Sequence, residues 1–139
     1  MSDTKVITIG LSNTPFHELS PYNFCTFKAY GMKWRTLIHY WSAMYFDDGT
    51  LRNLIRNQEQ PQKALLLANS KGMKDLGQLS PEIFLFGIQE QFNQNPQLKL
   101  ILLSTGSSEL TFIGNKGYLS YNNRYGKILM KLRDLYQEE

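Results

Sequence analysis

The sequence contains few of the residues from which metal and redox sites are built. Among 139 residues there are one cysteine, Cys25, and two histidines, so no intramolecular disulfide can form. A zinc site would need carboxylates at unusual spacing. Cys25 alone is more typical of a buried structural residue than of a nucleophile. We therefore expect no metal ion and no cofactor.

Long apolar runs and runs of basic residues are also lacking. No apolar run reaches the roughly 18 residues that a membrane helix needs. The start MSDTKVITIG has neither the basic residues nor the apolar length of a signal peptide, so we expect a cytoplasmic protein without a membrane partner. The net charge of +3 suits a phosphate-bearing ligand and does not require nucleic acid. Arg52 and Arg56, four residues apart, are expected to share a solvated helix face.

The composition predicts a folded, helix-rich domain. Hydrophobic residues make up 42% and aromatic residues 13% of a chain whose length fits one domain. Short strands are predicted over 5–11 and 109–113, and a hairpin or extended connection over 23–35. Helices are predicted over 37–46, 50–57 and 61–70, from Pro81 onward, and over 97–104 and 125–136. The pattern indicates an α+β fold with a few short strands.

Two of these helices carry expectations about burial. The segment TLIHYWSAMYF (36–46) is apolar on nearly every side, which predicts a central, buried helix with Thr36 as its N-cap. Asp47 and Asp48 are expected to cap this helix. The last helix is predicted to place one apolar stripe against the core, formed by Tyr125, Ile128, Leu129, Leu132, Leu135 and Tyr136.

Common catalytic motifs are missing from the chain. It has no Walker phosphate loop and no GxGxxG, GxSxG or HExxH motif. His39 has two interpretations: a buried helix histidine bonded to a backbone carbonyl or to Ser42, or a residue that lines a cleft. Residue spacing alone thus gives an α+β domain without an assigned chemistry.

Three stretches, in the same order and at similar spacing, match motifs of one known family. LSPYNFCTFKAYGMKWRTLIHYWSAMYF (19–46) resembles FSNFxxxxFxxDGxxWxTxEHYxQAxKF. QFNQNPQLKLILLSTGSSEL (91–110) is similar to KFxQNxxLxxxLLxTGxxxL, and NNRYGKILMKLRDLY (122–136) to KNxLGxxLMxLRxxL. By these stretches the chain resembles the NADAR superfamily, which includes the YbiA-like N-glycosidases. The resemblance implies a single compact domain of that fold over 1–139.

The resemblance also implies a chemistry. Members of the family cleave or recognise N-glycosidic bonds in ribosyl compounds, including phosphoribosylamino intermediates and ADP-ribosyl groups. Such cleavage passes through an oxocarbenium-like centre, which a nearby carboxylate stabilises or supplies with activated water. Basic or amide donors hold the phosphate, and aromatic rings stack on the base. An acidic residue is therefore the first feature to look for.

The chain departs from the family pattern where the acids are expected. The family's glutamate before His-Tyr corresponds to Ile38, and the acid after the TG motif corresponds to Phe112. Losing one such carboxylate costs orders of magnitude in rate if it acts in the transition state. Glu18 is the candidate replacement because it precedes the Leu-Ser-Pro-Tyr element. Its alternative is a solvated loop acid.

The candidate ligand-binding residues come from the matched motifs, and each has a structural alternative. Trp34 is either a core aromatic or a stacking platform. Asn123 and Arg124 either meet a phosphate at the start of the last helix or act as a capping asparagine and a solvated arginine. The full set of candidates is Ser20, Tyr22, Trp34, His39, Asn123 and Arg124.

Three functional hypotheses remain open from the sequence. The first is a NADAR-like protein that binds ADP-ribose, an NAD-derived compound or another ribosyl-phosphate nucleotide without hydrolysing it. The second is an active N-glycosidase with a relocated acid such as Glu18. The third is a structural protein that keeps only the fold and binds a protein partner. Small size and lost acids would also suit a rapidly diverging genome such as that of a phage.

Overall fold

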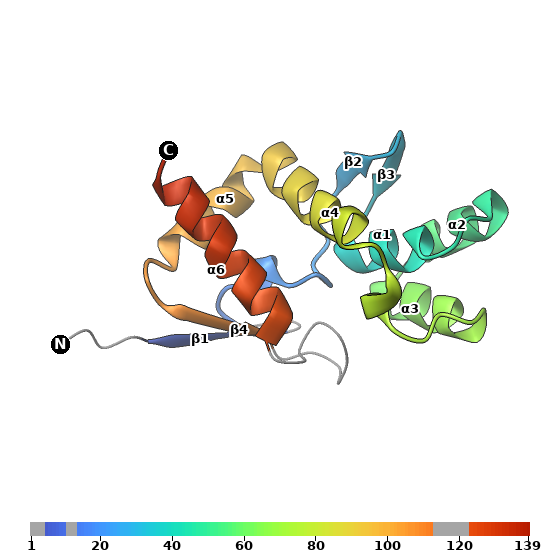
Figure 1. The fold of residues 1–139 in the computed structure, drawn as a ribbon, viewed down its shortest axis with the longest axis horizontal. Helices are drawn as coiled ribbons and strands as arrows, with labels where there is room; N and C mark the ends of the chain where they lie inside the picture. The colour runs from blue at the N-terminus through green and yellow to red at the C-terminus, as the bar shows by residue number, and fades with distance from the viewer. Residues whose placement is uncertain (1–4, 11–13, 113–122) are drawn as a thin grey trace. The chain divides into compact units, whose positions relative to one another are not determined.

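The computed structural model describes residues 5–10, 14–112 and 123–139. The chain divides into two units, one formed by residues 21–95 and the other by residues 1–20 with 96–139. Figure 1 shows the elements of each unit as ribbons. The helix-rich α+β class with a few short strands is confirmed. The single-domain range 1–139 stays a prediction.

The unit of residues 21–95 combines one β-hairpin with four α-helices. Its helices begin and end close to the predicted residues, and a short 3-10 helix, η2, precedes the last of them. The elements are β2 (Phe27–Ala29), β3 (Met32–Trp34), α1 (Leu37–Met44), α2 (Gly49–Arg56), α3 (Pro61–Ser70), η2 (Leu76–Gln78) and α4 (Pro81–Gln94).

The predicted hairpin is confirmed, and side chains of α4 cover its outer edge. Tyr30 and Gly31 form the turn with φ of 54° and 74°, the left-handed conformation that a two-residue hairpin turn needs. Gln94 bonds both the N–H and the carbonyl of Lys28, and Asn95 donates to the Thr26 carbonyl at 3.1 Å. These amides satisfy backbone groups of β2 that no neighbouring strand pairs in the described part of the chain.

Helix α1 is the buried centre of this unit, as predicted. All eight of its residues are buried, and Thr36 caps it by accepting the N–H of His39 at 3.1 Å. It packs against α2, α3 and α4. The hydroxyl of Tyr40 and the indole of Trp41 donate to carbonyls in the first turn of α4, so even the polar atoms of these rings are satisfied. Asp48 does not cap this helix, because its carboxylate accepts N–H groups at the start of α2.

The second unit pairs two strands in parallel beside a helix. Its elements are β1 (Val6–Ile9), the 3-10 helix η1 (His17–Leu19), α5 (Pro96–Ser104), β4 (Glu109–Phe112) and α6 (Arg124–Gln137). Strands β1 and β4 pair with Val6 opposite Glu109, and α6 packs against β4 (Figure 1). A Cβ on Gly126 would lie 2.3 Å from the Leu110 carbonyl oxygen, so glycine permits the close approach of α6 to β4.

The buried stripe of α6 differs in part from the prediction, because Tyr125 and Leu129 are the predicted residues that are fully buried. Leu135, expected in the core, is 57% exposed, whereas Arg133 is only 5% exposed and donates to the Thr105 hydroxyl at 2.8 Å. Apolar periodicity alone predicts that an arginine lies at the surface of a helix. Arg133 is buried instead, because its guanidinium finds a hydrogen-bond acceptor in the Thr105 hydroxyl of the TG motif. The arginine therefore ties the last motif of the chain to the TG turn.

Candidate functional site

His39 lies at 0% exposure, and both of its ring nitrogens are hydrogen-bonded within the protein. Nε2 lies 2.8 Å from the Gln58 carbonyl oxygen, and Nδ1 lies 2.8 Å from the Thr36 hydroxyl. A carbonyl only accepts, so Nε2 carries the proton and Nδ1 accepts from the Thr36 hydroxyl. This pattern fits a neutral imidazole. The bond to the Gln58 carbonyl matches the first interpretation of His39, a buried helix histidine bonded to a backbone carbonyl. A role of His39 in ligand binding remains a proposal.

The surroundings of His39 favour its neutral form. Burial lowers the pKa of His39 below its ordinary value of 6.5, and the nearby positive charge of Arg35 acts in the same direction. The hydrogen bond to the Gln58 carbonyl opposes them, because it favours the protonated ring. Burial has the largest effect, so the ring stays uncharged at neutral pH.

We expect the stability of the fold to fall as His39 becomes protonated. A histidine whose pKa is lower in the folded than in the unfolded state contributes stability that is complete above the unfolded pKa and is lost as pH falls below it. The free energy of unfolding should therefore drop between pH 7 and pH 5, by up to about 1.4 kcal/mol per pH unit for one proton. Urea unfolding at both pH values measures this drop.

The matched variants are His39→Gln and His17→Gln. His17 has a side chain that is 42% exposed, so His17→Gln is the control for removing an imidazole from the surface instead of from the core. His39→Gln should be less stable overall and show a smaller drop between the two pH values. Equal drops in wild type and His39→Gln would contradict this account of the ring.

The other candidates near the first motif are also buried. Trp34 lies at 0% exposure, and its indole N–H donates to the Ala29 carbonyl at 3.0 Å, across the hairpin that it closes. Tyr22 is 7% exposed and Ser20 is 2% exposed. In this structure none of these three presents an open surface to a ligand, and a part in binding remains a proposal for each.

The candidates of the other unit have separate surroundings. The Asn123 side chain donates to the Leu110 carbonyl at 2.8 Å and accepts the Phe112 N–H at 3.3 Å, so it holds β4 rather than capping α6. Arg124 is exposed at the first position of α6. The Glu18 carboxylate lies 3.5 Å from His17 Nδ1 and is 41% exposed. Residues 113–122, which precede Asn123, lie outside the described residues.

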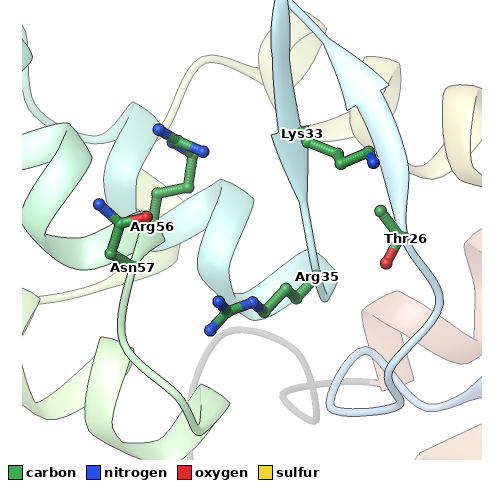
Figure 2. A pocket seen from close by; sticks show the side chains of 5 residues that line it. All are labelled: Thr26, Lys33, Arg35, Arg56 and Asn57. Carbon is green, nitrogen blue, oxygen red and sulfur yellow. The ribbon is translucent and has the colours of Figure 1, made fainter.

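The structure brings together a set of residues that the sequence did not indicate as a binding site. Thr26, Lys33, Arg35, Arg56 and Asn57 line a pocket of about 340 Å³ within the unit of residues 21–95. Figure 2 shows Arg35 extending from the end of β3 toward the segment that carries Arg56 and Asn57, with Lys33 and Thr26 on the hairpin side. We call this the basic pocket, because three cations and, among the residues that the structure describes, no carboxylate line it.

Hydrogen bonds fix the two walls of the basic pocket relative to each other. Arg35 Nη1 donates to the Gln58 carbonyl at 3.0 Å, the same oxygen that accepts from His39. Arg56 Nη2 donates to Asn53 at 3.2 Å. Arg52 and Arg56 therefore do not share one solvated face as predicted. The Arg52 side chain lies near Asp47 and donates to the Phe46 carbonyl, whereas Arg56 lines the pocket.

The residues at the family's acidic positions are buried and apolar. Ile38 lies at 0% exposure in α1 and Phe112 at 4% exposure at the end of β4. Among the described residues, no group of three or more His, Cys, Asp or Glu side chains lies where it could hold a metal ion. No helix in the described part of the chain is long and apolar enough to cross a membrane.

Comparisons with known proteins find relatives of two names. No family model matches the chain. It is 31% identical over 124 residues to a riboflavin biosynthesis protein of Vibrio vulnificus. The match covers 82% of this chain and 34% of that protein, so the chain spans about a third of that relative's length. It is 25% identical to the N-glycosidase YbiA of Escherichia coli over 96% of this chain and 89% of YbiA.

A solved structure shows the same fold. The NMR structure of E. coli YbiA matches 99% of this chain and 87% of its own, with a TM-score of 0.82 at 24% identity. The relatives match nearly the whole sequence, and the fold agrees over the same range. The chain is therefore similar to YbiA in sequence and shares its fold, and these comparisons support a YbiA-like member of the NADAR superfamily.

Proposed function

We propose that this protein binds a nucleotide-derived or ribosyl-phosphate ligand, such as ADP-ribose or an NAD-derived compound, without cleaving its N-glycosidic bond. The relatives named as an N-glycosidase and as a riboflavin biosynthesis protein support a ligand of this class. The observation that carries the proposal is the burial of apolar Ile38 and Phe112 at the positions where the resemblance places acids. Without a carboxylate at the anomeric carbon, the oxocarbenium-like transition state loses its main electrostatic support.

The remaining acids near the matched motifs offer weak replacements. The Asp48 carboxylate is engaged by the N–H groups of Thr50 and Leu51 as the N-cap of α2. Asp47 is fully solvated and lies 3.8 Å from Arg52. Glu18 is half-exposed beside His17, and a solvated carboxylate has little of the low-dielectric advantage that an enzyme site provides.

Calorimetric titration with ADP-ribose, NAD and ribosyl phosphates tests the proposal. We expect at least one of them to bind with a dissociation constant below about 1 mM, the affinity of a modest set of polar contacts. Chromatography of the same samples should recover the ligand intact. Absence of binding by all of them at millimolar concentration would contradict the proposal and favour a protein that keeps only the fold. Release of a base that Glu18→Gln abolishes would instead favour an active N-glycosidase.

A further inference from the structure

We propose that the basic pocket holds the phosphate group of this ligand, and that the pocket is specific for a ribosyl phosphate or diphosphate end. The inference rests on the proposed function and adds to it a site and a binding determinant. The pocket residues Thr26, Lys33, Arg35, Arg56 and Asn57 are the ones that would contact the phosphate.

Charge is the first reason for this inference. Lys33, Arg35 and Arg56 line one pocket, and within the described ranges no carboxylate forms an ion pair with any of them. Three like charges in one concavity repel one another, and a phosphate with about two negative charges offsets most of that repulsion. Asn57 and Thr26 add neutral donors at the rim, so the lining consists of groups that can donate to phosphate oxygens.

Arg56 gives a second, independent reason. Its Nε atom is buried and makes no hydrogen bond in the described part of the chain, although its Nη2 bonds Asn53. A buried guanidinium N–H without an acceptor is rare, because it loses its hydration and gains nothing in return. An oxygen of a bound phosphate supplies the missing acceptor. Arg35, with one N–H held by the Gln58 carbonyl, presents a guanidinium whose orientation is set before the ligand arrives.

The size and lining of the pocket define which part of the ligand enters. At about 340 Å³ it lies at the lower end of the roughly 300–1,000 Å³ that ligand pockets occupy. No aromatic ring is among its lining residues in the described ranges, so none of these residues stacks on a base. A phosphate with its attached ribose fits this lining, and the base would lie outside the pocket. The same absence of stacking rings disfavours single-stranded nucleic acid as the occupant.

One feature opposes anion binding. Arg56 is the last residue of α2, and the C-terminal end of a helix carries partial negative charge. For a short helix this weakens anion binding by about twofold to fivefold. Each charge-assisted hydrogen bond contributes about tenfold to hundredfold, so two arginines outweigh the helix end.

Isotope-edited NMR titration with ribose 5-phosphate and inorganic pyrophosphate tests the inference. We expect the amide signals of residues 26, 33–35 and 56–58 to shift with a saturating dependence on either probe. Arg35→Gln and Arg56→Gln should each weaken binding about tenfold or more, and the double variant about a hundredfold. The control is Lys63→Gln with Lys71→Gln, which removes two exposed charges outside the pocket and should weaken binding by less than about threefold.

Each outcome of this experiment decides one proposal. Shifts confined to other residues, or equal weakening by the pocket and control double variants, would overturn the pocket as the phosphate site. Tighter binding of an oligonucleotide than of ribose 5-phosphate, with equal sensitivity to both double variants, would overturn it as well. If ADP-ribose binds but the pocket variants do not weaken it, the proposed function stands and this inference fails. If pyrophosphate binds in the pocket but no ribosyl compound binds, the inference to a phosphate site stands and the proposed function fails.

Discussion

Replacing Ile38 by glutamate, the residue that the family motif carries, should lower the free energy of unfolding by about 3–5 kcal/mol. Ile38 is at 0% exposure in a helix whose eight residues are all buried. A carboxylate there would lose its hydration without a charged partner, and folding would require it to be protonated. A loss of this size approaches the whole stability of many domains.

Urea unfolding at pH 7 measures the effect of Ile38→Glu, with Ile38→Met as the control. Methionine keeps the side chain apolar and of similar volume, so we expect a loss below about 1.5 kcal/mol. The two variants would be equally stable only if position 38 were open to solvent. A folded Ile38→Glu protein that releases base from a ribosyl compound would mean that the chain has kept a usable cleft beside α1.

The Gly87→Ala substitution should destabilise the protein by about 2–3 kcal/mol or more. A Cβ at this position would lie 2.3 Å and 2.6 Å from two ring carbons of Tyr40. The ring cannot easily turn away, because its hydroxyl donates to the Ile83 carbonyl at 2.6 Å and its edge and face contact Phe27 and Trp34. Either α4 or the aromatic cluster must move.

The control for Gly87→Ala is Gly49→Ala, at the first position of α2. No atom lies within 4 Å of a Cβ built there. Alanine should therefore be neutral or stabilise α2 by up to about 1 kcal/mol, because it restricts the unfolded chain. Thermal unfolding of both variants separates the helix preference, which they share, from the collision with Tyr40. A Gly87→Ala protein as stable as Gly49→Ala would mean that α4 does not approach α1 this closely.

The sequence motifs that carry the family resemblance are explained here mostly by framework contacts. Thr36 caps α1, and Gln94 and Asn95 bond the backbone of β2. Asn123 holds β4, and Arg133 bonds Thr105 of the TG turn. The presence of these motif residues in the chain is therefore explained by the fold, whether or not the family reaction is retained.

The parts of the structure that could be predicted are those set by local sequence. These features act within a few residues of the chain: Thr36 before an apolar helix, Pro61 at the start of α3, and Tyr30-Gly31 between short strands. Burial of Arg133 depends on a hydroxyl 28 residues away, which no local pattern contains. Local periodicity consequently predicted the helix correctly, but it placed Leu135 in the core wrongly and made no prediction for Arg133.

The basic pocket could not be predicted for the same reason. Arg35 follows a strand and Arg56 ends a helix, and each is an ordinary surface residue in its own segment. Both line the same pocket, where Arg35 and His39 donate hydrogen bonds to the carbonyl of Gln58, two residues after Arg56. The motif match makes His39 a candidate ligand contact, yet its ring forms hydrogen bonds to Thr36 and to Gln58, whose carbonyl also holds Arg35 of the pocket.

Chromatographic recovery of a bound ligand tests most directly the claim that the protein keeps the family fold and binds without cleaving. ADP-ribose and pyrimidine ribosyl phosphates are incubated with the protein above the dissociation constant measured by calorimetry, and intact ligand and free base are quantified over time. The account predicts binding, full recovery of the ligand and the same result for Glu18→Gln. Release of base by the wild type at a rate above the protein-free control, abolished by Glu18→Gln, would contradict it.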